Sequence, residues 1–198
     1  MARAAPYDRD QTLSAAMSIF WDRGYHATSL KDLEQALSMK PGSIYAAFKS
    51  KENLYLLALE KYFTASRTLF RDNAARAASP LQMLADHLRA YPMLPTNDAA
   101  RQACMLTKTM VDTRTTDPVI AARSREYMGA MRTEFTTVFA KAKAQGELPA
   151  DANPARLARR YQANITALRL ELSAGSGQPD LVDLAEDMAC EVQALHTH

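Results

Sequence analysis

Apolar residues recur along the chain with the spacing of helix faces. One such face, with positions i, i+3, i+4 and i+7, consists of Leu13, Ala16, Met17 and Phe20. Gly24 follows where a helix C-terminus is expected. The pattern therefore predicts a first helix that ends just before Gly24.

A second, short helix is predicted behind a polar cap. Thr28 or Ser29 can supply that cap, because a side-chain oxygen at this position accepts a hydrogen bond from the first helical turn. The apolar stripe of the helix is Leu30, Leu33 and Leu37.

A third helix is predicted over residues 41–48, because Pro41 suits the first helical position. Ile44 and Phe48 lie one turn apart on it and should face the core. Ser50 then caps a long fourth helix that reaches to about residue 77.

The rest of the chain repeats one device, a capping residue followed by proline. It occurs at Ser79-Pro80, Asp117-Pro118 and Asn153-Pro154, and Gly146 and Gly175 end two of the helices. The predicted helices are 80–91, 98–113, 118–145, 154–174 and 179–196. No alternating strand pattern is visible. The sequence therefore predicts an all-α fold of about nine helices.

Composition narrows the class of protein. Of the 198 residues, 47% are hydrophobic, which is enough for a packed core and argues against a disordered chain. The apolar runs are short, and residues 1–10 lack the core of a signal peptide, so we expect a cytoplasmic protein without a membrane span. The two cysteines cannot form a disulfide framework, and no cysteine or histidine has metal-ligand spacing. We expect neither a metal nor a cofactor.

The charge is unevenly distributed. The net charge is +2; residues 1–51 carry seven Lys or Arg against five Asp or Glu, and the remainder is balanced at 17 against 17. Local positive charge of this kind is a weak indication of polyanion binding.

The second and third predicted helices have the form of a helix-turn-helix, whose second helix enters the major groove of DNA. Small residues there allow the backbone close to the bases, and an alanine methyl can touch a thymine methyl. Nearby hydroxyl and ammonium groups can hold phosphates. The predicted DNA-binding residues are Thr28, Ser29, Lys40, Pro41, Gly42, Ser43, Tyr45, Ala46, Lys49 and Lys51.

Several short motifs follow one another between about residues 9 and 56, and their order and spacing are informative. They are Gly24-Tyr25, Thr28-Ser29-Leu30, Gly42-Ser43-Ile44-Tyr45, Phe48 and Ser50-Lys51-Glu52-Asn53-Leu54. Together they resemble the N-terminal signature of the TetR family of one-component bacterial transcriptional repressors. The resemblance implies that Thr28, Tyr45 and Lys51 contact phosphates, and that Lys40, Ser43 and Ala46 lie on the exposed face of the recognition helix.

Two departures from the family pattern affect this region. Ser38 stands where the family usually has glycine, so we expect a tilted or strained turn. Ala46 and Ala47 replace the aromatic or histidine that is common after the tyrosine, so more of the specificity should come from DNA shape.

The resemblance also implies two functional domains. We expect residues 1–51 to bind DNA and residues 52–198 to bind a small-molecule effector and to form a homodimer on double-stranded, palindromic operator DNA. No Gly/Ser-rich linker separates these parts, so their junction should run through the fourth helix.

The last two predicted helices carry long apolar stripes, which suit a four-helix interface with a second copy. The alternative is that these stripes are buried within one chain. The predicted interface residues are Leu168, Leu172, Leu184, Met188 and Val192.

An effector pocket among the middle helices should have apolar walls with a few polar anchors. Ten methionines suit an adaptable cavity, although core packing is the commoner role for any one of these side chains. The candidates are Phe63, Met83, Leu88, Tyr91, Cys104, Met105, Met110, Tyr127, Met131, Phe135, Tyr161 and Asn164. Arg169 and Glu171 could bind a polar ligand group, but a solvated face or an interface ion pair is the commoner role.

Cys104 lies in a stretch that resembles helix six of TetR-type regulators, some of which sense electrophiles or oxidants. Lys108, four residues on, would favour the reactive thiolate, although a buried inert cysteine is the more frequent case. Cys190 lies among carboxylates, Asp187 and Glu191, which should raise the pKa of its thiol.

Two other function classes remain open. One is a helical module that binds protein instead of DNA. The other is an enzyme, for which the sequence shows no nucleophile and base pair, no carboxylate dyad and no glycine-rich phosphate loop.

Overall fold

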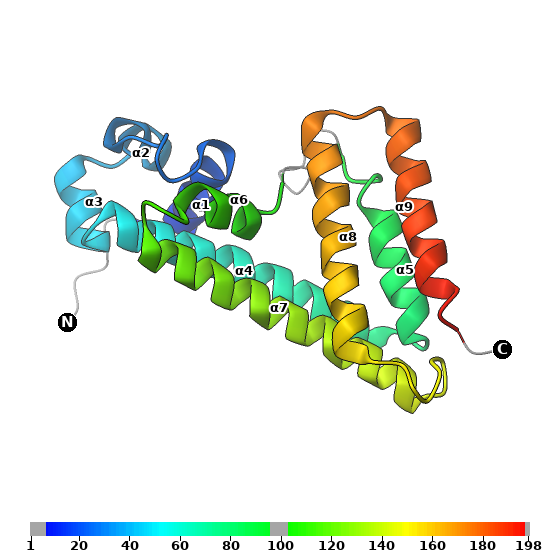
Figure 1. Cartoon of the computed structure of the whole chain (residues 1–198). Coiled ribbons are helices and arrows are strands. Elements are labelled where there is room, and N and C mark those ends of the chain that lie inside the picture. Colours follow the sequence, from blue (N-terminus) through cyan, green and yellow to red (C-terminus); the bar gives the residue numbers. More distant parts are fainter. Residues whose placement is uncertain (1–6, 96–102, 197–198) are drawn as a thin grey trace. The chain divides into compact units, whose positions relative to one another are not determined.

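A computed structural model describes residues 7–95 and 103–196 of the chain. Every regular element in these residues is a helix, as the hydrophobic periodicity predicts (Figure 1). The helices are α1 Arg9–Arg23, α2 Leu30–Leu37, α3 Pro41–Phe48, α4 Lys51–Arg76, α5 Pro80–Ala90, α6 Met105–Thr113, α7 Pro118–Ala144, α8 Pro154–Ala174 and α9 Gln178–Gln193. The expected helix 98–113 begins at Met105 in the described residues, and residues 98–102 lie outside them.

Local capping chemistry places the helix ends where the sequence predicts them. The hydroxyl of Ser29 accepts from the Asp32 N–H at 3.2 Å, and the Asp32 carboxylate accepts from the Ser29 N–H at 2.8 Å, which completes a capping box. Ser50, Ser79 and Asn153 each accept a backbone hydrogen bond at the start of α4, α5 and α8. These ends are fixed by contacts within three residues, so the sequence alone reveals them.

Among the described residues, two other than glycine have a left-handed φ, and both flank α3. Ser38, in the turn before it, has φ 51° and ψ 38°, so the expected strain at this position is confirmed. Lys49, directly after it, has φ 68°, and the Ser50 N–H donates to the Phe48 carbonyl at 2.8 Å. A γ-turn therefore ends α3 and leads directly into α4.

The chain folds as two compact units. Unit 1 comprises the described residues through Ala65 together with Met105–Glu126, and unit 2 comprises the rest of the described chain. Thus α6 packs with the N-terminal helices, and both α4 and α7 contribute to both units. The functional boundary expected after residue 51 stays a prediction.

The core of unit 1 holds the short helices in place. Phe20, Leu33, Phe48 and Tyr55 are all almost completely buried there. The rings of Phe20 and Tyr55 meet edge to face with centroids 4.8 Å apart. Burial of a large apolar side chain stabilises a fold by about 1.5–3 kcal/mol, so these residues hold the helices α1, α2, α3 and α4 together.

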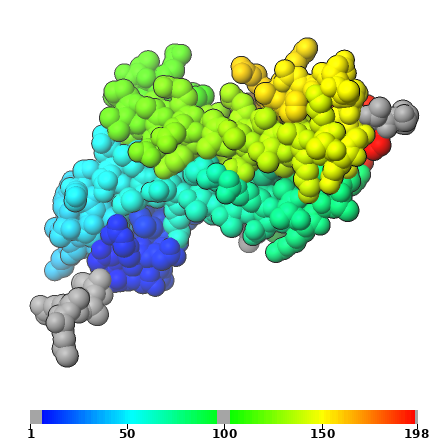
Figure 2. All heavy atoms as spheres, turned by 90° about the horizontal axis from the view of Figure 1, so that it is seen from below, coloured from blue at the N-terminus to red at the C-terminus, as the bar shows by residue number. Residues whose placement is uncertain are grey.

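The core of unit 2 is formed by α5, α7, α8 and α9, with the end of α4. On one side of it, Glu134 of α7 accepts hydrogen bonds from Arg67 and Arg71 of α4 at 2.7–2.8 Å. Figure 2 shows the yellow-green residues of α7 beside the teal residues of α4. In Figure 1, α9 lies along α5.

The expected interface stripe lies mostly inside unit 2. Leu168, Leu172 and Val192 are buried within the chain, at 0%, 5% and 5% exposure, so their side chains are not available to a partner. Leu184 and Met188 are half-buried and pack against the same core. The physical reason is that α8 and α9 need these stripes to cover α5, which is the alternative that the periodicity left open.

Candidate nucleic-acid interface and effector site

The outer face of α3 presents the side chains expected to read DNA. Gly42, Ser43, Tyr45, Ala46 and the adjoining Lys49 are exposed, with Tyr45 at 47%. The opposite face consists of Ile44 and Phe48, at 2% and 0% exposure, so the prediction that these two face the core is confirmed. The helix therefore has one face fixed in the core and one face open to a partner.

The start of α3 is also open. No side chain caps this end of the helix. Lys40, at the N-cap, is exposed, and Pro41 is partly buried. A Cβ added to Gly42 would meet nothing within 4 Å, so the backbone here is accessible. The N–H groups of Ser43 and Ile44 donate to the Lys40 carbonyl, so this end favours an anion such as a phosphate through the positive end of the helix dipole and the Lys40 ammonium.

Thr28 and Ser29 occupy different environments despite being neighbours. Ser29 is exposed and caps α2. Thr28 is completely buried, and its hydroxyl donates to the Gly24 carbonyl at 2.7 Å. Its side chain supports the turn between α1 and α2, so the interface proposed below does not include it.

Lys51 packs on the ring of Tyr25, with Nζ 4.5 Å from the ring centroid. Partial burial lowers the pKa of Lys51, while Asp117 and Asp32 oppose this shift. Burial likewise raises the pKa of the Tyr25 hydroxyl, and the carboxylate of Asp117 adds to that shift. Two positions of the N-terminal signature are thus coupled by a cation–π contact.

Helix α6 is tied to the N-terminal helices by polar contacts. The Lys108 ammonium donates to the Trp21 and Asp22 carbonyls, at 2.6 and 3.2 Å, and so caps the C-terminus of α1. The hydroxyls of Tyr55 and Thr109 lie 2.7 Å apart and are buried. These contacts link α6 to both α1 and α4 inside unit 1.

A polar cluster lies within the core of unit 2. The Tyr161 hydroxyl donates to the Leu84 carbonyl at 2.9 Å, so the His87 Nδ1, at 2.8 Å from the same hydroxyl, must donate to it. Burial, with a smaller contribution from Arg169, lowers the pKa of His87 to about 4. The imidazole is therefore neutral near pH 7.

Arg169 and Glu171 have different surroundings. Arg169 is 8% exposed, with its guanidinium carbon 5.7 Å from the Tyr91 ring centroid. The expectation of a solvated face or an interface ion pair is thus wrong for Arg169. Glu171, in contrast, is exposed, and its carboxylate accepts a hydrogen bond from the Ser176 hydroxyl at 2.6 Å. His87 was not predicted as a site residue from the sequence, although the i, i+4 spacing of His87 and Tyr91 places them on one helix face.

The structure brings together only part of the expected effector pocket. Met83, Leu88, Phe135 and Tyr161 belong to one buried cluster, against which Tyr91 and Met131 pack. In the same unit, Tyr127 is buried, and Cys104 and Asn164 are half-buried. Phe63, Met105 and Met110 lie in unit 1 instead. The role of all these candidate residues in effector binding stays a prediction.

The two cysteines differ in surroundings. Cys104 directly precedes the first residue of α6, and the Lys108 ammonium donates to carbonyls at the end of α1. The expectation that Lys108 favours the Cys104 thiolate stays a prediction. The pKa of Cys190 is raised, as expected, but mainly because its thiol donates to Glu186 at 3.2 Å. Asp187 contributes less.

None of the described helices combines the length and the apolar composition that a membrane span requires.

Residues 13–58 match the family profile of bacterial regulatory proteins of the TetR family, and residues 77–184 match the profile of the tetracyclin repressor-like C-terminal domain.

Known proteins similar to this chain are regulators, which is not an enzymatic role. The transcriptional repressor ComR of Escherichia coli K12 is 28% identical over 189 residues, covering 92% of this chain and 88% of ComR. A cysteine mutant of the TetR family regulator CifR, complexed with operator DNA, is 30% identical, covers 96% and 98% of the two chains, and has a TM-score of 0.82. A regulator from Cytophaga hutchinsonii shares the fold, with a TM-score of 0.84 at 18% identity over 96% and 95% of the chains. This chain belongs to the TetR family of bacterial transcriptional regulators, which bind DNA through an N-terminal helix-turn-helix.

Proposed function

We propose that the protein is a cytoplasmic repressor that binds a palindromic operator as a homodimer and is released by a small-molecule effector. The observation that carries this proposal is the outer face of α3, where small, hydroxyl and ammonium side chains are exposed beside an uncapped helix start. In support, the similar regulator CifR was solved with a 26-base-pair double-strand operator DNA.

The proposed DNA contacts fall into two groups. Ser43 and Ala46, on the exposed face of α3, read base edges in the major groove. Lys40 and Lys49, with the Tyr45 hydroxyl and the half-buried Lys51, hold phosphates and so fix the register. Ser29 is not included, because its N–H and its hydroxyl both donate to the Asp32 carboxylate. Pro41 and Gly42 bring the backbone of the first turn close to the DNA.

The proposed dimer uses the outward face of α8. Ala163, Ala167, Leu170 and Ala174 are exposed there at helical spacing, and Leu170 is 60% exposed. Small residues around one leucine allow a second copy of the helix to approach closely. A second copy is the expected occupant, because a palindromic operator requires two recognition helices related by two-fold symmetry.

The proposed effector acts on unit 2, and Cys104 is a candidate for covalent capture. Addition of its thiolate to a ring carbon of a quinone forms an S–C bond as the ring C=C π bond breaks. The oxygens take up protons and the substituted carbon loses its hydrogen, so the ring is reduced to a hydroquinone thioether and no other oxidant is needed. Cys104 is the last residue of a unit 2 segment, and α6 of unit 1 starts at the next residue. An adduct there would lie directly before the first turn of α6.

The proposal is tested by enrichment of a random-sequence duplex library on the wild-type protein. We expect a palindromic sequence to be enriched and then to be retained against competitor DNA. A quinone should release wild type and Cys190→Ser, but not Cys104→Ser. Absence of any enriched sequence would refute operator binding. If the quinone releases Cys104→Ser from the operator as readily as wild type, covalent capture by Cys104 is refuted and the effector binds non-covalently.

A further inference from the structure

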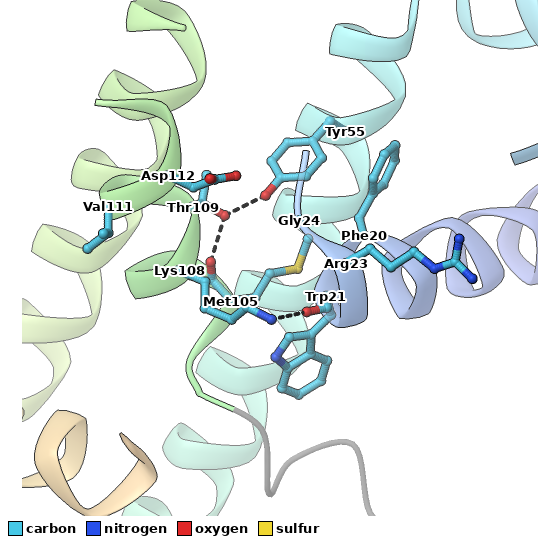
Figure 3. Close-up of a pocket in the computed structure, with 10 residues that line it drawn as sticks. All are labelled: Phe20, Trp21, Arg23, Gly24, Tyr55, Met105, Lys108, Thr109, Val111 and Asp112. Atoms are coloured by element: carbon cyan, nitrogen blue, oxygen red, sulfur yellow. Dashed lines mark hydrogen bonds between the residues drawn. The ribbon is translucent and has the colours of Figure 1, made fainter. Parts of the chain in front are cut away.

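Unit 1 contains a half-open pocket between α1 and α6, well away in sequence from the proposed DNA contacts of α3. Its volume is about 260 Å³. Figure 3 shows its lining: Phe20, Trp21, Arg23, Gly24, Tyr55, Met105, Lys108, Thr109, Val111 and Asp112. Pockets for drug-sized ligands usually exceed about 300 Å³, so this one suits a molecule with a single ring.

The floor of the pocket is aromatic and apolar. Phe20, Trp21, Tyr55 and Met105 line it and are at most 6% exposed. The polar atoms of the floor already have partners, because the hydroxyls of Tyr55 and Thr109 bond to each other and the Thr109 hydroxyl also donates to the Met105 carbonyl. The floor therefore offers ring faces and a thioether to a ligand ring.

The rim carries charges of both signs, but its cations are already engaged. Arg23 pairs with Asp32 at 2.6 Å, and Lys108 donates to two carbonyls at the negative end of the α1 dipole. Asp112 is exposed and forms no ion pair with any described residue. Its Oδ2 would lie 3.2 Å from a Cβ added to Gly24, so the carboxylate lies beside the C-terminal end of α1.

We propose that this pocket binds a small aromatic cation. The ligand ring packs on Trp21 and Phe20, and the cationic group pairs with the Asp112 carboxylate at the rim. The electron-rich faces of aromatic side chains also attract cations, so the floor and the Asp112 carboxylate favour the same sign of charge. The two rim cations are held away from the ligand, Arg23 by Asp32 and Lys108 by the carbonyls at the end of α1. The negative charge of Asp112 reaches the floor, where it contributes to raising the pKa of Tyr55, together with the larger effect of burial.

A bound ring would touch α1 and α6 at once, beside the Lys108 contact that joins them. Binding is therefore expected to change operator affinity as well. This consequence rests on the proposed function, whereas the site itself rests only on the pocket.

The chain provides its own reporter, because Trp21 is its single tryptophan and lines the pocket. The test is titration of the DNA-free full-length protein with benzamidine, neutral benzamide and anionic benzoate, monitored by tryptophan fluorescence. We expect a saturable change with benzamidine at about millimolar concentration and about fivefold weaker binding of benzamide. Asp112→Asn should remove the preference, whereas Asp72→Asn, an equal charge change at an exposed position of α4 in unit 2, should keep it.

Equal affinity for the three probes, or a preference that survives in Asp112→Asn with an unchanged circular dichroism spectrum, would overturn the proposal. So would a fluorescence change that never saturates, because this indicates collisional quenching. Operator affinity with and without benzamidine is measured separately. A failure to bind operator then refutes the DNA function and leaves the fluorescence result standing.

Discussion

At the scale of single residues, backbone conformation explains where this chain departs from its family. Ser38 occupies the left-handed region, which costs a residue with a Cβ about 1–2 kcal/mol and costs glycine little. The sequence predicted strain at this position because glycine is usual there. The buried state of Thr28 was not predictable in this way, because its neighbour Ser29 could equally have supplied the cap.

Replacing Ser38 with glycine should stabilise the protein. We expect Ser38→Gly to raise the free energy of unfolding by about 1 kcal/mol, because the left-handed strain is relieved. In a chain of this length that corresponds to about 2–4 °C in Tm. Ser38→Ala is the control, because it keeps the strained φ and removes only the hydroxyl. A thermal unfolding curve for Ser38→Gly that is no higher than that of Ser38→Ala would contradict this explanation.

At the scale of helices, ends were predictable and partners were not. Caps such as Ser79 and Asn153 act within three residues, so their effect is visible in the sequence. The stripe that includes Leu168 shows that one face of α8 is apolar, but periodicity is the same whether that face meets α5, α9 or a second copy. Only the packed structure shows that this stripe is internal and that Leu170 is external.

The outward face of α8 gives a direct test of the dimer. Leu170→Glu should convert a dimer into monomers in sedimentation equilibrium, because a carboxylate would have to be buried against its symmetry mate. Leu69→Glu on α4 is a matched control, since Leu69 is 64% exposed against 60% for Leu170 and lies outside the proposed interface. A Leu170→Glu protein that sediments as a dimer would place the interface on another surface.

At the scale of the whole molecule, the sequence predicted the class of fold and the DNA-binding motif but not the contacts between distant segments. Lys108 and Trp21 are 87 residues apart, and nothing in the sequence near either residue signals their contact. The same holds for the assignment of α6 to unit 1 and for the pocket between α1 and α6. Such features depend on how helices pack, which one sequence does not specify residue by residue.

The proposed docking of two copies of α3 on one operator can be tested by the salt dependence of operator binding by Lys40→Ala. Lys40 is exposed at the start of α3, and each lost phosphate contact flattens the plot of log Kobs against log salt by about 0.9. A dimer loses two such contacts, so we expect a slope flatter by about 1.8. Lys141→Ala, at an exposed position of α7, should keep the wild-type slope. An unchanged slope for Lys40→Ala would contradict docking through α3, and a change of only about 0.9 would contradict binding by two chains.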